Sequence, residues 1–300
     1  MTKFQYIVTK EDEGVPIKGL LRRKFSFSSR LMTKLKFQHL VFLNGDPVAG
    51  WITPKPGDVL SVALPEEKSD FPMEDIPIYP AYEDDDLLIL NKQPGVTVHP
   101  TKGHPVHTIA NGLMKYMKDT NQSFKIRFVN RLDMDTTGLL IVAKNSHAQD
   151  ELTKQMKANT IEKRYMAMVN GLVAEDMFTI DLPIGRPDTD HVARAVMMEG
   201  GSPSITHVKV LERYPKGKGF SLVQLKLETG RTHQIRVHLA HLGHPLVGDY
   251  LYGGDNPLLF QRQALHAYQL SFFHPVSGEP ITVTAEPPED MKKLIETVSS

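Results

Sequence analysis

Residues 126–144 read IRFVNRLDMDTTGLLIVAK and place one arginine and two aspartates between two apolar runs. The runs at 126–129 and 139–143 have the composition of buried strands. The charged residues between them, Arg131, Asp133 and Asp135, must then lie on a turn with rigid walls. Binding and catalytic groups are commonly placed in this way. The stretch therefore predicts two strands and a functional site between them.

Strand patterns dominate the chain beyond residue 78, and helical patterns are few. Apolar or alternating runs typical of strands recur, in LLILNK, GLLIVAK, EKRYMAMVNG, THVKVLERY, FSLVQLKLETG and LHAYQLSFFHP. The glycine-rich fragments YGGDN and PKGKGF lack the spacing of a phosphate-binding loop. We therefore expect an α+β fold with a mixed, mostly antiparallel sheet, and not a nucleotide-binding α/β fold.

Composition narrows the class of protein further. The chain has 300 residues, 40% of them hydrophobic, and carries no cysteine and no formal net charge. No apolar run approaches the roughly 18 residues of a membrane helix, and residues 1–14 lack a signal-peptide core. We expect a protein without membrane contact, and the absence of cysteine fits a cytoplasmic location.

Charge is segregated along the chain although it balances overall. Residues 14–45 contain no acidic residue and seven basic ones, which are Lys18, Arg22, Arg23, Lys24, Arg30, Lys34 and Lys36. Residues 65–86 are strongly acidic. We expect a small basic module at 1–64, an acidic, extended and solvated linker at 65–78, and a catalytic domain at 79–300. A basic face of this kind attracts phosphate, although an unevenly charged surface without function is the alternative.

A second dense segment, LETGRTHQIRVHLAHLGHPLVGD, spans residues 227–249. Its spacing predicts a helix over about 232–242, capped by Thr232 and ended by Gly243. Arg231 would lie at the helix entrance, where a carboxylate or phosphate could meet it. Arg236 would lie on the more polar side of the helix.

Two other chemistries are less compatible with the sequence. The histidines at 99–107 and 233–244 lack the spacing of a helical zinc site, and we expect no metal. A glycosidase would need two opposed carboxylates, which Asp133 and Asp135 on one loop rarely supply. Asp135 is read as a turn-stabilising residue. For Asp133 a structural salt bridge to Arg131 stays open.

Four segments together resemble the RluA-type pseudouridine synthases, over about residues 80–290. They are NRLDMDTTGLLIVAKN, EKRYMAMVNG, ETGRTHQIRVHLAHLGHPLVGDYLYGG and LHAYQLSFFHP. The preceding module resembles, more loosely, the alpha-L RNA-binding domain of small-subunit ribosomal protein four. One departure is visible, because the family usually has histidine where this chain has Asn130.

The resemblance implies the pseudouridine synthase fold and the isomerisation of uridine to pseudouridine in RNA. It implies that Asp133 is the essential carboxylate and that Arg231 is its partner. It also implies that Tyr165 stacks on the uracil, with its hydroxyl as a candidate for helping to remove the C5 proton, and that Leu265 is a weaker candidate for the pocket wall under the base. Arg131 would enter the RNA stack as the uridine leaves it.

The reaction requires no cofactor and no metal. RNA is the expected partner, and we expect the protein to be a monomer. The attached basic module favours large-subunit ribosomal RNA over transfer RNA. The alternatives are a non-catalytic RNA-binding protein of the same fold and an unrelated nucleoside or glycoside hydrolase. Free uracil as the product would indicate the hydrolase, and RNA binding without product would indicate the binding protein.

Overall fold

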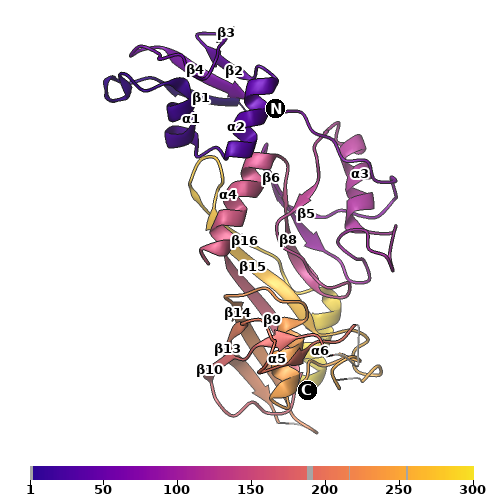
Figure 1. Ribbon diagram of the computed structural model, residues 1–300. Helices are drawn as coiled ribbons and strands as arrows, with labels where there is room; N and C mark the ends of the chain where they lie inside the picture. Colours follow the sequence, from indigo (N-terminus) through magenta and orange to yellow (C-terminus); the bar gives the residue numbers. More distant parts are fainter. Residues whose placement is uncertain (1–2, 188–191, 216, 255) are drawn as a thin grey trace.

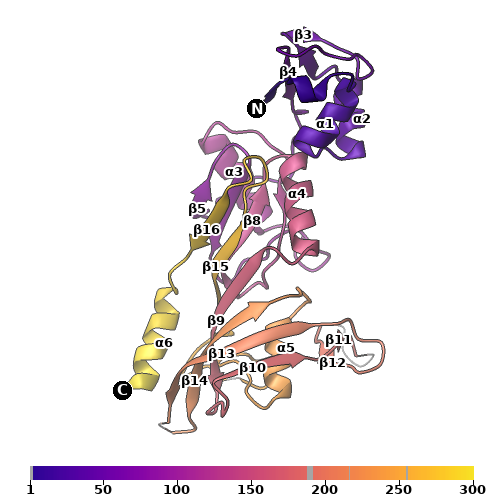
Figure 2. The same ribbon diagram turned by 90° about the vertical axis from the view of Figure 1, so that its left-hand side faces the viewer.

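The computed structural model describes residues 3–187, 192–215, 217–254 and 256–300. A small N-terminal module sits at one end of a long, sheet-based domain, and Figures 1 and 2 show both. The larger domain combines a mixed, mostly antiparallel sheet with a few helices. The expected α+β class is therefore confirmed.

The N-terminal module has its own hydrophobic core, which buries residues from Phe4 to Leu64. Its four strands pair in the order β1-β4-β2-β3, and Ser28 caps α2 by accepting a hydrogen bond from the Leu31 amide. The elements are β1 (Lys3–Ile7), the short 3-10 helix η1 (Lys10–Asp12), α1 (Ile17–Phe25), α2 (Ser29–Phe37), β2 (Val41–Leu43), β3 (Asp46–Pro47) and β4 (Val59–Ala63).

A ten-stranded sheet forms the frame of the larger domain. Eight strands follow the order β10-β13-β14-β9-β15-β8-β6-β5, with β16 beside β15 and β7 beside β8. The strands are β5 (Pro80–Glu83), β6 (Leu87–Lys92), β7 (Arg127–Phe128), β8 (Thr137–Ala143), β9 (Glu162–Asn170), β10 (Met177–Asp181), β13 (Ile205–Tyr214), β14 (Phe220–Leu227), β15 (Leu265–Phe273) and β16 (Pro280–Thr284). A separate ribbon joins β11 (Ile184–Gly185) to β12 (Ala195–Val196).

The two halves of the sheet meet where β8 runs parallel to β15. The other pairings between described strands of this sheet are antiparallel. Gly138 pairs with Ala267 at this junction and has φ +105°. A Cβ atom built there would lie 2.2 Å from the Ala267 carbonyl oxygen. Only glycine permits this approach, which seats the loop before β8 directly beside β15.

Four helices belong to the larger domain: α3 (Ile109–Asp119), α4 (Ser146–Lys157), α5 (Gln234–His241) and α6 (Glu289–Ser299). The predicted helix over 232–242 is confirmed in outline, and Gly243 has the left-handed φ of +81°. The predicted cap is wrong, because the residue before the helix is His233, with φ 58°. Arg236 is also not on a polar face, since it is buried like its apolar neighbours.

The acidic segment 65–78 has neither helix nor strand, but it is not the solvated linker expected from its charge. Glu67 accepts from Lys34 on α2 and pairs with Arg127 on β7. Phe71 and Ile78 pack against the main core of the larger domain. The expectation of an extended, solvated linker is wrong because apolar and ion-paired residues alternate with the exposed acidic ones.

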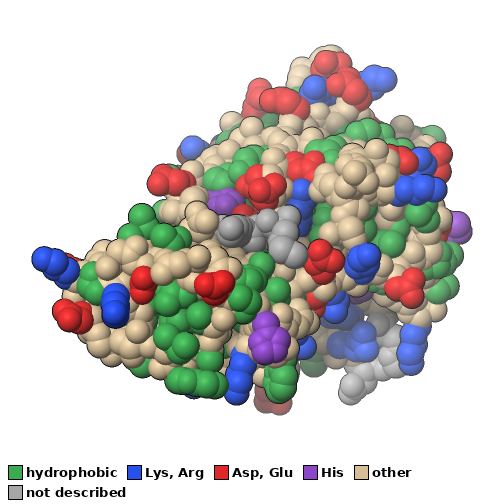
Figure 3. Space-filling view, turned by 90° about the horizontal axis from the view of Figure 1, so that it is seen from above, with side chains coloured by type: hydrophobic (Ala, Val, Ile, Leu, Met, Phe, Trp, Pro, Cys, Tyr) green, Lys and Arg blue, Asp and Glu red, His purple; other side chains and the backbone are tan. Residues whose placement is uncertain are grey.

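Aromatic side chains attach the N-terminal module to the larger domain. The ring of His147 on α4 lies 5.1 Å from the rings of both Phe4 and Phe27. Figure 3 views the molecule from the side of this module and shows basic and acidic side chains interspersed on that face. No helix in the described part of the chain is long and apolar enough to span a membrane.

Candidate active site

The loop between β7 and β8 is held to the sheet by its second residue, Asn130. The Asn130 side chain accepts a hydrogen bond from the Ile141 amide at 2.7 Å and donates to the Leu139 carbonyl at 3.3 Å. These two bonds replace backbone pairing where the chain leaves the sheet. The amide at this position therefore has a local structural role, and the turn itself is closed by Thr136 N–H donating to the Asp133 carbonyl.

A buried lysine anchors the other end of the loop. Lys92, at the end of β6, is 1% exposed, and its Nζ donates to the carbonyls of Gln93, Met134 and Thr136 at 2.8, 2.6 and 3.0 Å. Three carbonyl acceptors match the three N–H donors of an ammonium group. Burial lowers the pKa of Lys92 to about 7, while Asp135 and Asp133 act in the opposite direction.

Asp133 projects from this loop toward α5 and meets a buried guanidinium. Arg236 Nη1 donates to Asp133 Oδ2 at 3.2 Å. The same guanidinium binds both oxygens of Asp249, at 2.7 and 2.8 Å, and Asp249 is fully buried. Burial acts to lower the pKa of Arg236. The hydrogen bonds and the negative charge of Asp249, and then those of Asp133, outweigh burial and raise that pKa. Arg236 is thus fixed by one carboxylate and presents its free edge to the other.

A histidine and a tyrosine complete the surroundings of Asp133. His233 Nε2 lies 3.9 Å from Asp133 Oδ2, and its Nδ1 is 2.8 Å from the Tyr252 hydroxyl. Burial lowers the pKa of His233 against the opposing effect of Asp133 and so favours the neutral imidazole. The Arg236 guanidinium also lies over the Tyr252 ring, 5.1 Å from its centroid.

The five residues that the sequence indicated all line one cavity of about 50 Å³ beside these groups. Tyr165 on β9 and Leu265 on β15 are buried residues of its wall. Burial and then the Asp133 charge raise the pKa of the Tyr165 phenol, and its hydroxyl has no hydrogen-bond partner among the described residues. The cavity has room on the order of one or two waters.

The two exposed arginines flank this cavity from different loops. Arg131 Nη2 donates to Thr232 Oγ1 at 2.9 Å and so connects the loop before β8 to the loop before α5. Arg231 Nε donates to the Pro203 carbonyl at 3.3 Å. The guanidinium that pairs with Asp133 is that of Arg236, so the expected partnership with Arg231 is wrong. Arg231 precedes the helix at its exposed entrance, whereas Arg236 lies in the first turn that faces the sheet.

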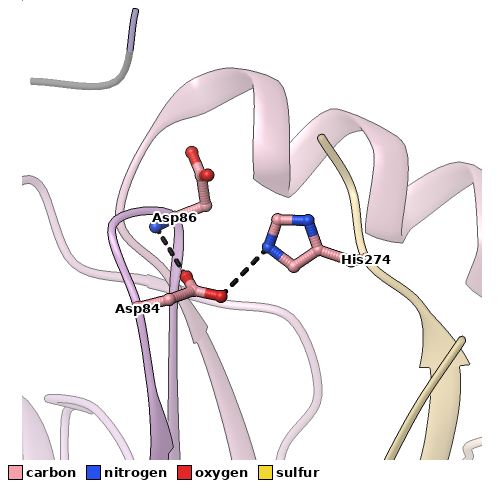
Figure 4. Close-up of side chains that lie close together, drawn as sticks. All are labelled: Asp84, Asp86 and His274. Carbon is pink, nitrogen blue, oxygen red and sulfur yellow. Dashed lines mark hydrogen bonds and ion pairs between the residues drawn. The ribbon is translucent and has the colours of Figure 1, made fainter. Parts of the chain in front are cut away.

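The histidine clusters do not gather into a metal centre in the part of the chain that the structure describes. His238 bonds Thr206 and the Leu182 carbonyl, and His244 bonds the Asn170 carbonyl. The one group with metal-like spacing among the described residues is Asp84, Asp86 and His274, drawn in Figure 4. Asp84 there accepts hydrogen bonds from His274 and from the Asp86 amide, so the group serves as a turn anchor.

The sequence pattern does not indicate three contributors to the site. The helical spacing predicts Arg236 on the polar side of its helix, whereas the structure buries it. Asp249 follows an apolar run, and Lys92 ends the run LLILN. A lone charge beside such a run is a weak signal of a buried, paired group. Nothing in the sequence indicates which partner each one takes.

The chain is similar in sequence and in fold to known proteins. Residues 86–241 match the family model described as RNA pseudouridylate synthase. The chain is 44% identical over 264 residues to the uncharacterized RNA pseudouridine synthase YlyB of Bacillus subtilis (strain 168), covering 86% of this chain and 85% of that protein. The solved structure of human RNA pseudouridylate synthase domain containing 1 is 28% identical with a TM-score of 0.58, covering 77% of this chain and 98% of that one.

The chain therefore belongs to the RNA pseudouridylate synthases, in their RluA-type family, and is an enzyme of that class. Ribosomal large subunit pseudouridine synthase D of Neisseria meningitidis serogroup A is also similar, with 41% identity over 247 residues. That match covers 79% of this chain and 65% of the relative.

Proposed function

We propose that this enzyme converts a uridine of large-subunit ribosomal RNA to pseudouridine at the cavity beside Asp133. The observation that carries the proposal is the ion pair between Asp133 and the buried Arg236, at 3.2 Å, on the edge of a cavity walled by Tyr165. Two further relatives named ribosomal large subunit pseudouridine synthase D, at 40% and 39% identity, favour that RNA. Transfer RNA is the alternative substrate.

Each residue of the cavity has a role in this proposal. Asp133 is the carboxylate that acts on the flipped nucleotide, either on the sugar or on the base. Arg236 keeps that carboxylate oriented and charged. Tyr165 and Leu265 form the wall against which the uracil lies while its N1–C1′ bond is broken and C5 is joined to C1′. C5 then loses its proton and N1 takes one up, so the product is an isomer of the substrate.

The two exposed arginines act on the RNA in this proposal. Arg131 leaves Thr232 when RNA binds and occupies the space vacated in the base stack, which offsets part of the few kcal/mol that base flipping costs. Arg231, whose exposed guanidinium has a backbone carbonyl as its partner, contacts a phosphate at the entrance.

The test compares two neighbouring carboxylates on the same loop. Asp133→Asn should abolish pseudouridine formation and leave RNA binding nearly intact, because the amide keeps the shape but removes the charge. Asp135→Asn is the matched control, since Asp135 does not line the cavity, and it should retain activity. An Asp133→Asn enzyme with more than a few per cent of the wild-type rate would refute the assignment.

Mapping pseudouridine in cells that lack the gene identifies the substrate. The loss of a modification in large-subunit ribosomal RNA supports the proposal, and a loss confined to transfer RNA contradicts it. Complementation with the wild-type gene and with the Asp133→Asn variant separates catalysis from RNA binding alone.

A further inference from the structure

A groove of about 540 Å³ separates the N-terminal module from the catalytic domain. We propose that this interdomain groove is a second RNA-binding site, which holds the sugar–phosphate backbone of the substrate at a distance from the target uridine. One wall is α2, and the other is formed by β7 and α4. In Figures 1 and 2 the end of α2 lies directly above α4. The inference rests on the proposed function, since it assigns where the same RNA continues.

The charges that line the interdomain groove favour an anionic occupant. Four cationic side chains face two carboxylates, Glu67 and Asp150. Glu67 is paired with Lys34 and Arg127, and Asp150 lies 3.6 Å from Lys154. The two remaining cations, Arg30 and Lys125, are both exposed, and neither forms an ion pair with a described carboxylate.

Arg30 and Lys125 belong to different modules, so a ligand that contacts both must lie between the modules. Arg30 is on α2 and Lys125 precedes β7. When RNA binds, cationic side chains without a carboxylate partner contact its phosphodiester oxygens. The counterions bound to the RNA are then released. Exposed His99 and half-buried Phe128, whose rings are 6.5 Å apart, add surfaces on which a base can stack.

The walls of the interdomain groove are held in place before any ligand arrives. Glu67 joins them, because it accepts from Lys34 at 2.9 Å on one side and pairs with Arg127 on the other. Burial acts to raise the pKa of Glu67, but Lys34 and Arg127 outweigh it and lower that pKa. A second attachment is Lys154 Nζ, which donates to the Ser26 carbonyl at 3.3 Å. A site held in this way loses little freedom when it binds.

The interdomain groove connects to the active site through one short stretch of chain. Lys125 and Asp133 are eight residues apart, which spans at most about 28 Å. Stacked nucleotides at about 3.4 Å each cover that distance in roughly eight nucleotides. The groove therefore contacts RNA at most about eight stacked nucleotides from the target.

The experiment removes the two unpaired cations and follows the salt dependence of binding. Arg30→Gln, Lys125→Gln and the double variant are compared with the wild-type enzyme on a long ribosomal RNA fragment. Each cationic side chain that is removed should reduce the slope of log K against log salt. The reduction should be about 0.7 where the side chain contacts single-stranded RNA and about 0.9 where it contacts a duplex. Lys125→Arg should keep the wild-type slope.

Lys118→Gln on α3 is the matched control, because Lys118 is exposed and lines neither the interdomain groove nor the active-site cavity. It should keep the wild-type slope on the long RNA. A short RNA with a single nucleotide on each side of the uridine should bind all variants equally. Single-turnover rates at saturating long RNA should stay within about twofold of wild type.

The outcomes separate this inference from the proposed function. Slopes that equal those of the wild type and of Lys118→Gln would overturn the groove as an RNA site, even if pseudouridine forms normally. A reduced slope on the long RNA with unchanged binding of the short RNA supports it. Failure of the wild-type enzyme to form pseudouridine in any ribosomal RNA would instead refute the proposed function, because binding is measured independently of product.

Discussion

Replacement of Arg236 by methionine should separate its structural role from its catalytic one. The change leaves Asp249, which is fully buried, with the Leu251 amide as its remaining described partner at 3.2 Å. Breaking a buried ion pair from one side costs about 3–5 kcal/mol, because the other charge stays buried without compensation. We expect the free energy of unfolding of Arg236→Met to fall by that amount.

A second substitution should restore stability without restoring the reaction. In Arg236→Met with Asp249→Leu the unpaired buried charge is gone, and replacing both partners by apolar groups is often nearly neutral. The double variant should recover most of the lost stability. Both variants lose the 3.2 Å hydrogen bond to Asp133, worth about 1.5–3 kcal/mol, so the single-turnover rate should fall roughly 10- to 150-fold in each.

The assay pairs urea unfolding with single-turnover pseudouridine formation at saturating RNA. Arg262→Met is the matched control for stability, since Arg262 also binds an aspartate through two nitrogens but its partner Asp290 is 44% exposed. That carboxylate stays hydrated, so the control should lose less than half as much stability as Arg236→Met. Wild-type activity in the stable double variant would refute the role given to Arg236.

The remaining predictions concern a lysine, a tyrosine and metal removal. The pKa of Lys92 is lowered to about 7 in the folded state from 10.5, so the unfolded chain binds more protons between those pH values. The free energy of unfolding of the wild type should therefore rise with pH in that window, by up to about 1.4 kcal/mol per pH unit, relative to that of Lys92→Met. Urea unfolding that gives the same pH dependence for both proteins would contradict this. Tyr165→Phe should keep wild-type stability, because its hydroxyl has no described partner. It should slow single turnover about tenfold or more if the hydroxyl helps to remove the C5 proton, and an unchanged rate would exclude that role. Activity on prefolded RNA should survive EDTA, with magnesium supplied separately to control for RNA folding, and loss reversed only by zinc would contradict the absence of a catalytic metal.

Local sequence patterns determined the elements and the position of the catalytic loop. The apolar runs on either side of Arg131 and Asp133 became β7 and β8, and Gly138 sits where its φ of +105° and its contact with Ala267 demand glycine. Such features follow from periodicity and backbone sterics, which act between near neighbours in the chain.

Only the tertiary structure decided which charges meet. Arg236 is 103 positions from Asp133 in the chain but only five positions from Arg231, which carries the same guanidinium group. The packing of α5 against the sheet turns Arg236 inward, whereas Arg231 lies in the loop before α5 and stays at the surface. The packing of Phe71 and the pairing of Glu67 likewise turned an acidic stretch into a docked segment. Which charged side chains pair over a long sequence distance depends on how whole helices and strands pack. Local composition and residue spacing do not specify that packing.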